Sequence, residues 1–182
     1  MTDEPGWALT RLIEIHTAMR DDLALLRRAV AAITANADDA DAVAEAFAVL
    51  SIRTPGWSLN RYCAAFCGFV HEHHSVEDSV MFPMLLEHGD GLQPVIAKLR
   101  ADHLLLTRYL DETERALTDL PGDAAATTAA VSALERLVEH LAAHLDFEEV
   151  SLTPALTALS TVVSEDDVPA PPADHLGVTA DG

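Results

Sequence analysis

The sequence has 182 residues, of which 49% are hydrophobic and 23% charged, and its formal net charge is −19. This length is sufficient for one domain with its own hydrophobic core. The excess of acidic side chains argues against binding to nucleic acid or to an anionic membrane surface, because both require basic patches on the protein.

The N-terminal region lacks the features of an export signal, and no apolar run reaches the length needed to span a bilayer. The first five residues are acidic at positions 3 and 4 and contain no basic residue. Cys63 and Cys67 are the only cysteines, and their spacing within an apolar stretch favours reduced, buried thiols over a disulfide framework. We therefore expect a cytoplasmic protein.

Apolar residues at helical spacing predict four long helices, over residues 9–35, 57–88, 92–118 and 123–160. A shorter Ala-rich helix is expected over 40–52. Pro83 and Pro154 are expected to bend the second and fourth long helices. Four long helices with short connections predict an all-α protein, an antiparallel up-down four-helix bundle with one short extra helix between the first and second long helices. The bundle domain is expected over 1–163, and the acidic, Pro-rich segment 164–182 is expected to be a disordered tail.

Two segments of the chain repeat the same chemical pattern. One begins at His73 and the other at His144, and in each an acidic pair starts four residues after the histidine and a proline follows after ten. The first helix of each helix pair carries a histidine of its own, His16 or His103. The acidic pairs and prolines are Glu77, Asp78 and Pro83 in the first segment, and Glu148, Glu149 and Pro154 in the second.

The repeated histidines and glutamates lie on helix faces that otherwise build the core. Residues four apart on a helix differ by about 40° in direction, so His73 and Glu77 point the same way. Burying unpaired carboxylates is costly, and a multivalent cation would compensate for the cost. Mixed imidazole and carboxylate donors favour iron, manganese or zinc, in a site of two ions bridged by both carboxylates. The candidate ligands are His16, His73, His74, Glu77, His103, His144 and Glu148.

Several other residues have two alternative interpretations. His140 is either a further ligand or a residue that contacts one, and Tyr62 is either a core residue or a hydrogen-bond donor to the centre. Carboxylates next to ligands could orient the imidazoles through their second nitrogen, or be ordinary solvated charges. The choice between Glu148 and Glu149 as the ligand stays open. The carboxylates concerned are Asp78, Asp102 and Glu149.

These motifs resemble those of the hemerythrin-like (HHE cation-binding) family over about residues 7–160. The matching residues are His16, His73-His74-x-x-Glu77-Asp78 with Phe82-Pro83, Asp102-His103, and His140-Leu-Ala-Ala-His144-x-x-x-Glu148-Glu149 with Pro154. The pattern is similar to the iron-sensing and actinobacterial branches of that family. The resemblance implies a four-helix bundle with two iron ions, an oxo- or hydroxo-bridged di-iron centre.

The resemblance also implies binding of, or reaction with, O2, peroxide or nitric oxide, in detoxification or a stress response. The expected partner is thus a small diatomic or peroxide ligand. Whether the protein is an enzyme is left open; such an enzyme would disproportionate peroxide or act on nitric oxide. The alternative is a non-catalytic sensor of oxygen, iron or redox state, or an oxygen-binding module. The oligomeric state is also left open, and a monomer is compatible with the sequence.

Overall fold

The computed structural model describes residues 6–35, 59–118 and 124–168. The predicted short helix over 40–52 lies outside these residues. The elements in chain order are α1 (Trp7–Ala35), α3 (Leu59–Val76), the π-helical turn η1 (Glu77–Met81), α4 (Phe82–His88), α5 (Gln93–Thr118), α6 (Ala124–Val162) and the 3-10 turn η2 (Glu165–Asp167).

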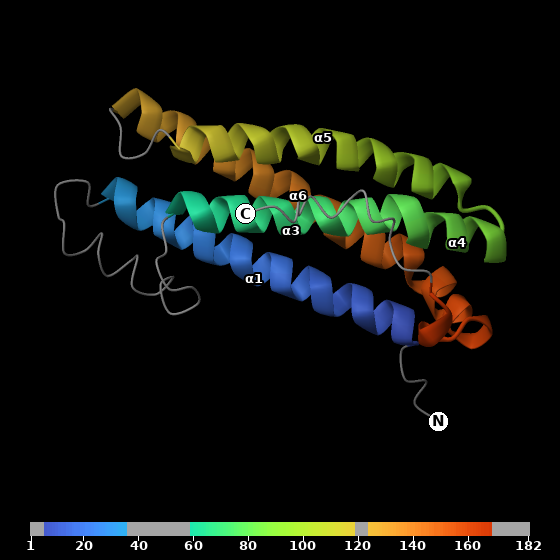
Figure 1. Cartoon of the computed structure of the whole chain (residues 1–182). Helices are drawn as coiled ribbons and strands as arrows, with labels where there is room; N and C mark the ends of the chain where they lie inside the picture. Colours follow the sequence, from blue (N-terminus) through green and yellow to red (C-terminus); the bar gives the residue numbers. More distant parts are fainter. Residues whose placement is uncertain (1–5, 36–58, 119–123, 169–182) are drawn as a thin grey trace, which may run out of the picture.

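The long helices pack as a bundle in which neighbours along the chain are neighbours in space. Contacts join α1 to α3, α3 to α5, α5 to α6 and α6 back to α1, which closes the ring. Successive helices run in opposite directions (Figure 1). The prediction of an all-α protein with four helices packed together is confirmed. Within the described residues, none of the helices combines the length and apolarity that crossing a membrane requires.

The core consists of two hydrophobic clusters with a polar layer between them. Along α1, Leu12 belongs to one cluster and Met19 to the other, with His16 between them. The same order recurs on α5, where His103 lies between Leu99 and Leu106. Because apolar residues pack on both sides of this layer, its histidines and glutamates are held in the interior at one level of the bundle.

The second arm of the bundle, which is formed by α3, η1 and α4, contains a π-helical turn just before Pro83. The N–H of Phe82 donates to the carbonyl of Glu77, five residues back, as in a π-helix. Pro83 lies in the first turn of α4, where its missing N–H is tolerated. Residues five apart on an α-helix would differ by about 140° in direction. The wider turn allows both Glu77 and Phe82 to face the interior, where both are buried.

The second proline does not interrupt its helix, since α6 runs through Pro154 as one element. The neighbouring hydroxyls bond back to the helix, that of Thr153 to the carbonyl of Glu149 and that of Thr157 to the carbonyl of Thr153. At the end of α6, Trp7 donates from its indole nitrogen to the carbonyl of Val163, which joins the two ends of the described chain. Residues 165–167 form η2, and 169–182 lie outside the described residues, so the expectation of a disordered tail stays a prediction.

Candidate metal centre

The polar layer gathers all seven candidate ligands at one level of the bundle. Each long arm of the bundle supplies at least one side chain, and every one of them is at most 8% exposed. The contributions are His16 from α1, His73 and His74 from α3, Glu77 from η1, His103 from α5, and His144 and Glu148 from α6.

These side chains form two groups of four that share Glu77. One group is His16, His73, Glu77 and Glu148, and the other is His74, Glu77, His103 and His144. Within each group, one donor atom per residue lies within 4.8 Å of every other. Donors on opposite sides of a bound ion stand about 4 Å apart, which is twice a metal–ligand bond of about 2.0–2.2 Å. Each group therefore has the size of a single-ion site.

The carboxylate of Glu77 joins the two groups through different oxygens. Its Oε1 lies 2.9 Å from Nε2 of His73, and its Oε2 lies 3.3 Å from Nε2 of His103. In the first group, Nε2 of His16 also lies 3.1 Å from Nε2 of His73. Glu77 thus has the position of a carboxylate that bridges two ions.

Glu148 rather than Glu149 faces the interior of the bundle. Its Oε2 lies 3.5 Å from Nε2 of His16 and 3.7 Å from Nε2 of His144. The side chain of Glu148 is fully buried, whereas that of Glu149 is 24% exposed. Glu148 is one of the first group only, although its oxygen also approaches an imidazole of the second.

The three neighbouring carboxylates lie on the outer side of the imidazoles, and each one contacts a cation. Distances between the outer Nδ1 and the carboxylate oxygen are 2.9 Å for His16 and Glu149, 3.2 Å for His103 and Asp78, and 3.7 Å for His144 and Asp102. The partner cations are Arg20 for Glu149, Arg100 for Asp78, and Lys98 for Asp102. The contact between His16 and Glu149 is a hydrogen bond, which fixes the direction of this imidazole and favours the proton on its outer nitrogen. The contacts of His103 and His144 are ion-pair distances only.

Burial and mutual repulsion keep most of these imidazoles uncharged. Burial, and after it the neighbouring His73, lowers the pKa of His16 to about 4. Burial and His103 lower the pKa of His144 to about 4, and burial also lowers the pKa of His74. Neutral imidazoles have a free lone pair at neutral pH, which is what metal binding requires.

The pKa values of Glu77, His103 and Glu148 depend on their charged neighbours. Burial alone would raise the pKa of Glu77, but the imidazoles of His73 and His103 lower it. Burial opposes the raised pKa of His103 too, and Asp78 and Glu77 outweigh it. Burial, together with the nearby Glu77 carboxylate, raises the pKa of Glu148 well above its usual value.

The cluster contains buried polar atoms that make no well-aligned hydrogen bond, although several of them lie at ion-pair distance from one another. This holds for both ring nitrogens of His74, His103 and His144 and for both carboxylate oxygens of Glu77 and Glu148. Buried polar groups without partners are rare and destabilising. Their concentration around the shared Glu77 fits residues that bind cations, and the mixed nitrogen and oxygen donors suit a transition metal.

The structure places His140 and Tyr62 away from the cluster. Nδ1 of His140 bonds to the carbonyl of Arg136, and its ring packs 4.6 Å from that of Tyr109. His140 has nearly the direction of His144 but lies about 6 Å away along the helix axis. His140 is not among the donors of either group. The hydroxyl of Tyr62 donates to Asp22 at 2.7 Å, as expected of a core tyrosine with a polar partner.

Several contacts at the centre are absent from the sequence prediction. The ring of His103 stacks on that of His74, with 4.1 Å between the ring centroids, and lies nearly parallel to that of Phe82 at 5.6 Å. The sequence pattern also did not predict the cation partners, although Lys98 precedes Asp102 by four residues and Arg20 follows His16 by four. That helical spacing is the signal that could have found them.

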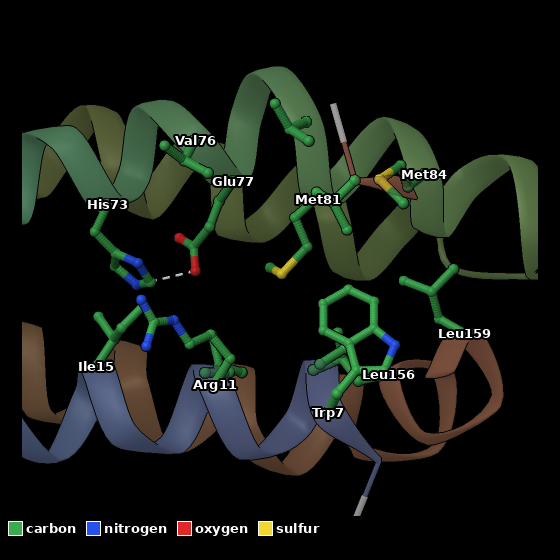
Figure 2. Close-up of a pocket in the computed structure, with 14 residues that line it drawn as sticks. Trp7, Arg11, Ile15, His73, Val76, Glu77, Met81, Met84, Leu156 and Leu159 are labelled. Atoms are coloured by element: carbon green, nitrogen blue, oxygen red, sulfur yellow. Dashed lines mark ion pairs between the residues drawn. The ribbon is translucent and has the colours of Figure 1, made fainter. Parts of the chain in front are cut away.

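An apolar pocket reaches the first group of donors from one side of the bundle. It has a volume of about 160 Å³ and lies between α1 on one side and η1 and α4 on the other. Figure 2 shows His73 and Glu77 at one end of this pocket and Trp7 and Met84 toward the other. Arg11 extends from α1 toward His73.

A second, more polar cleft opens on the other side of α3, toward α5. It is lined by His74 and His103 from the second group of donors, by the apolar Leu104, and by polar side chains around them. These side chains are His71, Ser75, Asp78, Ser79 and Thr107. The two donor groups therefore face openings of different character.

The comparison with protein families agrees with this geometry. The family model described as the hemerythrin HHE cation binding domain matches residues 8–156. This range contains every residue of the two donor groups. Comparison with curated proteins and with solved structures gives no match.

Proposed function

The chain belongs to the hemerythrin HHE cation-binding domain family, and on that premise we propose that it is a non-haem di-iron protein that binds or reacts with O2, peroxide or nitric oxide. The observation that carries the proposal is the position of Glu77, whose two oxygens face two separate groups of buried imidazoles. A single-ion site would not need the second group.

Each ion would be held by its own group of donors, with Glu77 between them. His16, His73 and Glu148 would hold one ion, and the second group would hold the other through the three imidazoles of His74, His103 and His144. Bound iron would supply an electron-rich, redox-active position for a small ligand. The imidazole-rich donor set stabilises reduced iron better than carboxylates alone would, which favours ligand binding and detoxification.

The residues around the donors would keep the centre assembled and dry. Glu149, held by Arg20, keeps the proton of His16 on its outer nitrogen, so that the inner nitrogen can bind metal. The hydrophobic clusters above and below the layer, which contain Phe66 and Phe82, exclude water along the bundle axis, so that access to the donors is confined to the two side openings. The low-dielectric surroundings strengthen the attraction between the carboxylates and a cation.

A second candidate function is a non-catalytic sensor of iron, oxygen or redox state. The hydrogen-bond deficit at Glu77 and Glu148 favours this alternative, because it couples the stability of the bundle to metal occupancy. Turnover separates the two candidates. A peroxide-disproportionating or nitric oxide-directed enzyme consumes its ligand continuously, whereas a sensor binds it once per chain.

The decisive experiment is the metal content of the untagged protein, measured by mass spectrometry together with its absorption spectrum. About two irons per chain, with the near-ultraviolet absorption of a bridged iron pair, is the expected result. Two zinc ions per chain after expression in iron-rich medium would leave the site but remove the redox function. Folded protein that binds no metal would overturn the proposal. Assays with peroxide and with nitric oxide then distinguish enzyme from sensor.

A further inference from the structure

The pocket beside His73 is larger than a diatomic ligand requires. Its volume of about 160 Å³ is close to that of an engineered cavity of about 150 Å³ that binds benzene inside a protein core. A water molecule in the liquid occupies about 30 Å³ by comparison. O2 or nitric oxide would leave most of the pocket unfilled.

The lining of the pocket is apolar except for Arg11, which is largely exposed and pairs with Glu14, and for His73 and Glu77. Leu12, Val80, Leu156 and Leu159 are buried around it, and Trp7 forms part of its wall. His73 and Glu77 form the inner polar end, and they belong to the first group of donors. A charged molecule would lose its hydration among these apolar side chains, so the lining favours an uncharged one.

The cleft on the other side of α3, toward α5, is more polar than this pocket. The cleft at His74 and His103 is bordered by histidines, hydroxyls and the Asp78 carboxylate. It suits water and cations rather than an organic molecule. Of these two openings, the pocket between α1 and η1–α4 is the more apolar, and an apolar ligand finds the better complementary surface there.

We propose that the pocket between α1 and η1–α4 binds an uncharged organic molecule about the size of a benzene ring, with one hydroxyl or hydroperoxyl group directed at the first group of donors. This inference deepens the proposed function by naming a class of ligand larger than O2, and the direction of its polar group rests on the metal centre proposed above. The apolar body lies along Trp7 and Leu156, and the oxygen-bearing group lies at the His73–Glu77 end.

Phenol and benzene are suitable probes, because they share one ring and differ in a single hydroxyl. The test uses the full-length, iron-loaded protein carrying Trp57→Phe, so that Trp7 is the only tryptophan left to report by fluorescence. Phenol should change the fluorescence saturably, and calorimetry should give the same dissociation constant. Phenol, but not benzene, should also alter the visible absorption of the iron centre.

Variants that fill the pocket should weaken binding. Ala8→Phe and Val76→Phe each place a ring in the space of the ligand, and we expect phenol affinity to fall about tenfold or more in both. Leu104→Phe is the matched control, because Leu104 is 71% exposed at the other cleft. The iron content of each variant shows whether it has folded.

The possible results are distinguishable from failure of the proposed function. Normal iron content without saturable phenol binding would overturn the pocket assignment alone. Equal phenol affinity in Ala8→Phe, Val76→Phe and Leu104→Phe would do the same. Phenol binding that leaves the iron absorption unchanged would overturn the assigned orientation. Absence of iron would instead contradict the metal centre.

Discussion

Nδ1 of His16 lies 2.9 Å from Oε1 of Glu149, while Nε2 of the same imidazole points into the polar layer, 3.1 Å from Nε2 of His73. The imidazole thus links a partly exposed carboxylate to the buried centre. Arg20 donates to the same oxygen of Glu149 at 2.7 Å and holds it in place. The contact therefore determines which nitrogen of His16 carries the proton.

Replacing Glu149 by alanine should weaken metal binding without removing a ligand. His16 would lose the acceptor for its outer nitrogen, and both its orientation and its tautomer would become less defined. Loss of such a partner typically lowers metal affinity about 10–100-fold. Competition with a chelator, followed by metal content and absorption, measures the effect. Glu149→Gln, which keeps an acceptor oxygen, should lose less affinity.

A matched control is available on the same pair of helices. Glu135 of α6 pairs with Arg27 of α1 at 3.2 Å, and both side chains are about half exposed. Glu135→Ala removes an ion pair between α1 and α6 that does not contact the centre, and surface pairs of this kind stabilise proteins little. Equal metal affinities of Glu135→Ala and Glu149→Ala would show that the orienting role is wrong.

Removing the shared carboxylate should affect both metal positions at once. Glu77→Ala takes one donor from each group, so we expect the metal content to fall from about two ions per chain to nearly none. His16→Ala and His144→Ala each take a donor from one group only. These two variants should retain about one ion per chain, which mass spectrometry of the purified variants would show.

Glu72→Ala is the control for the loss of a nearby negative charge, since Glu72 is exposed on α3, five residues before Glu77. It should retain the full metal content. If Glu77→Ala also retained one ion while His16→Ala retained none, the two groups would not share Glu77 as a bridge, and the assignment of two ion positions would have to be revised.

The fold and the donor cluster follow from two simple regularities of the sequence. Apolar spacing of three and four residues locates the long helices, and a histidine followed by an acidic residue four positions later locates donors on one face. The repetition of this pattern at His73 and His144 distinguishes it from an isolated core histidine. The prediction of four packed helices and the grouping of the candidate ligands depend on nothing further.

Other features depend on distances between helices, which spacing along one helix does not encode. His140 has nearly the same direction along α6 as His144. Its ring nevertheless packs against Tyr109 of α5 rather than in the donor cluster, and this depends on which part of α5 lies beside it. The π-helical turn at η1 arises where Glu77 and Phe82 must both face the interior. The stacking of Phe82 on His103 belongs to the same packing and has no counterpart in a one-dimensional pattern.

The two cysteines should not react with alkylating agents while the protein is folded. Their sulfurs lie 3.7 Å apart, both side chains are buried, and Cys67 donates to the carbonyl of Leu110. The contact with Cys63, together with burial, raises the pKa of Cys67, and only the thiolate is strongly nucleophilic. Iodoacetamide at pH 8 should label neither cysteine in the native protein and both in guanidinium, as read by mass spectrometry.

The exposed variant Ser132→Cys on α6 provides a positive control for this labelling, because residue 132 faces solvent. It should be labelled once in the native protein while Cys63 and Cys67 remain unmodified. Rapid labelling of either native cysteine would mean that the core around α3 and α5 opens far more often than its burial implies.

The buried donors should lower the stability of the metal-free protein, and Glu148→Leu should reveal this cost. Both oxygens of Glu148 are buried without a hydrogen bond, and burial with the nearby Glu77 raises its pKa. Removing an unsatisfied buried group typically recovers about 1–3 kcal/mol. In the presence of a chelator, the variant should therefore melt at a higher temperature than the unmodified protein, by roughly 2–4 °C for each kcal/mol.

Metal should reverse the order of the two melting temperatures. The unmodified protein gains stability in proportion to how tightly the folded state binds metal, whereas Glu148→Leu lacks one donor of the first group and gains less. Glu139→Leu, at an exposed position of the same helix, should melt like the unmodified protein under both conditions. A metal-free Glu148→Leu variant that melted below the unmodified protein would show that Glu148 stabilises the bundle by itself. The donor cluster would then be a structural polar network, since the apolar substitution would have removed favourable interactions that need no cation.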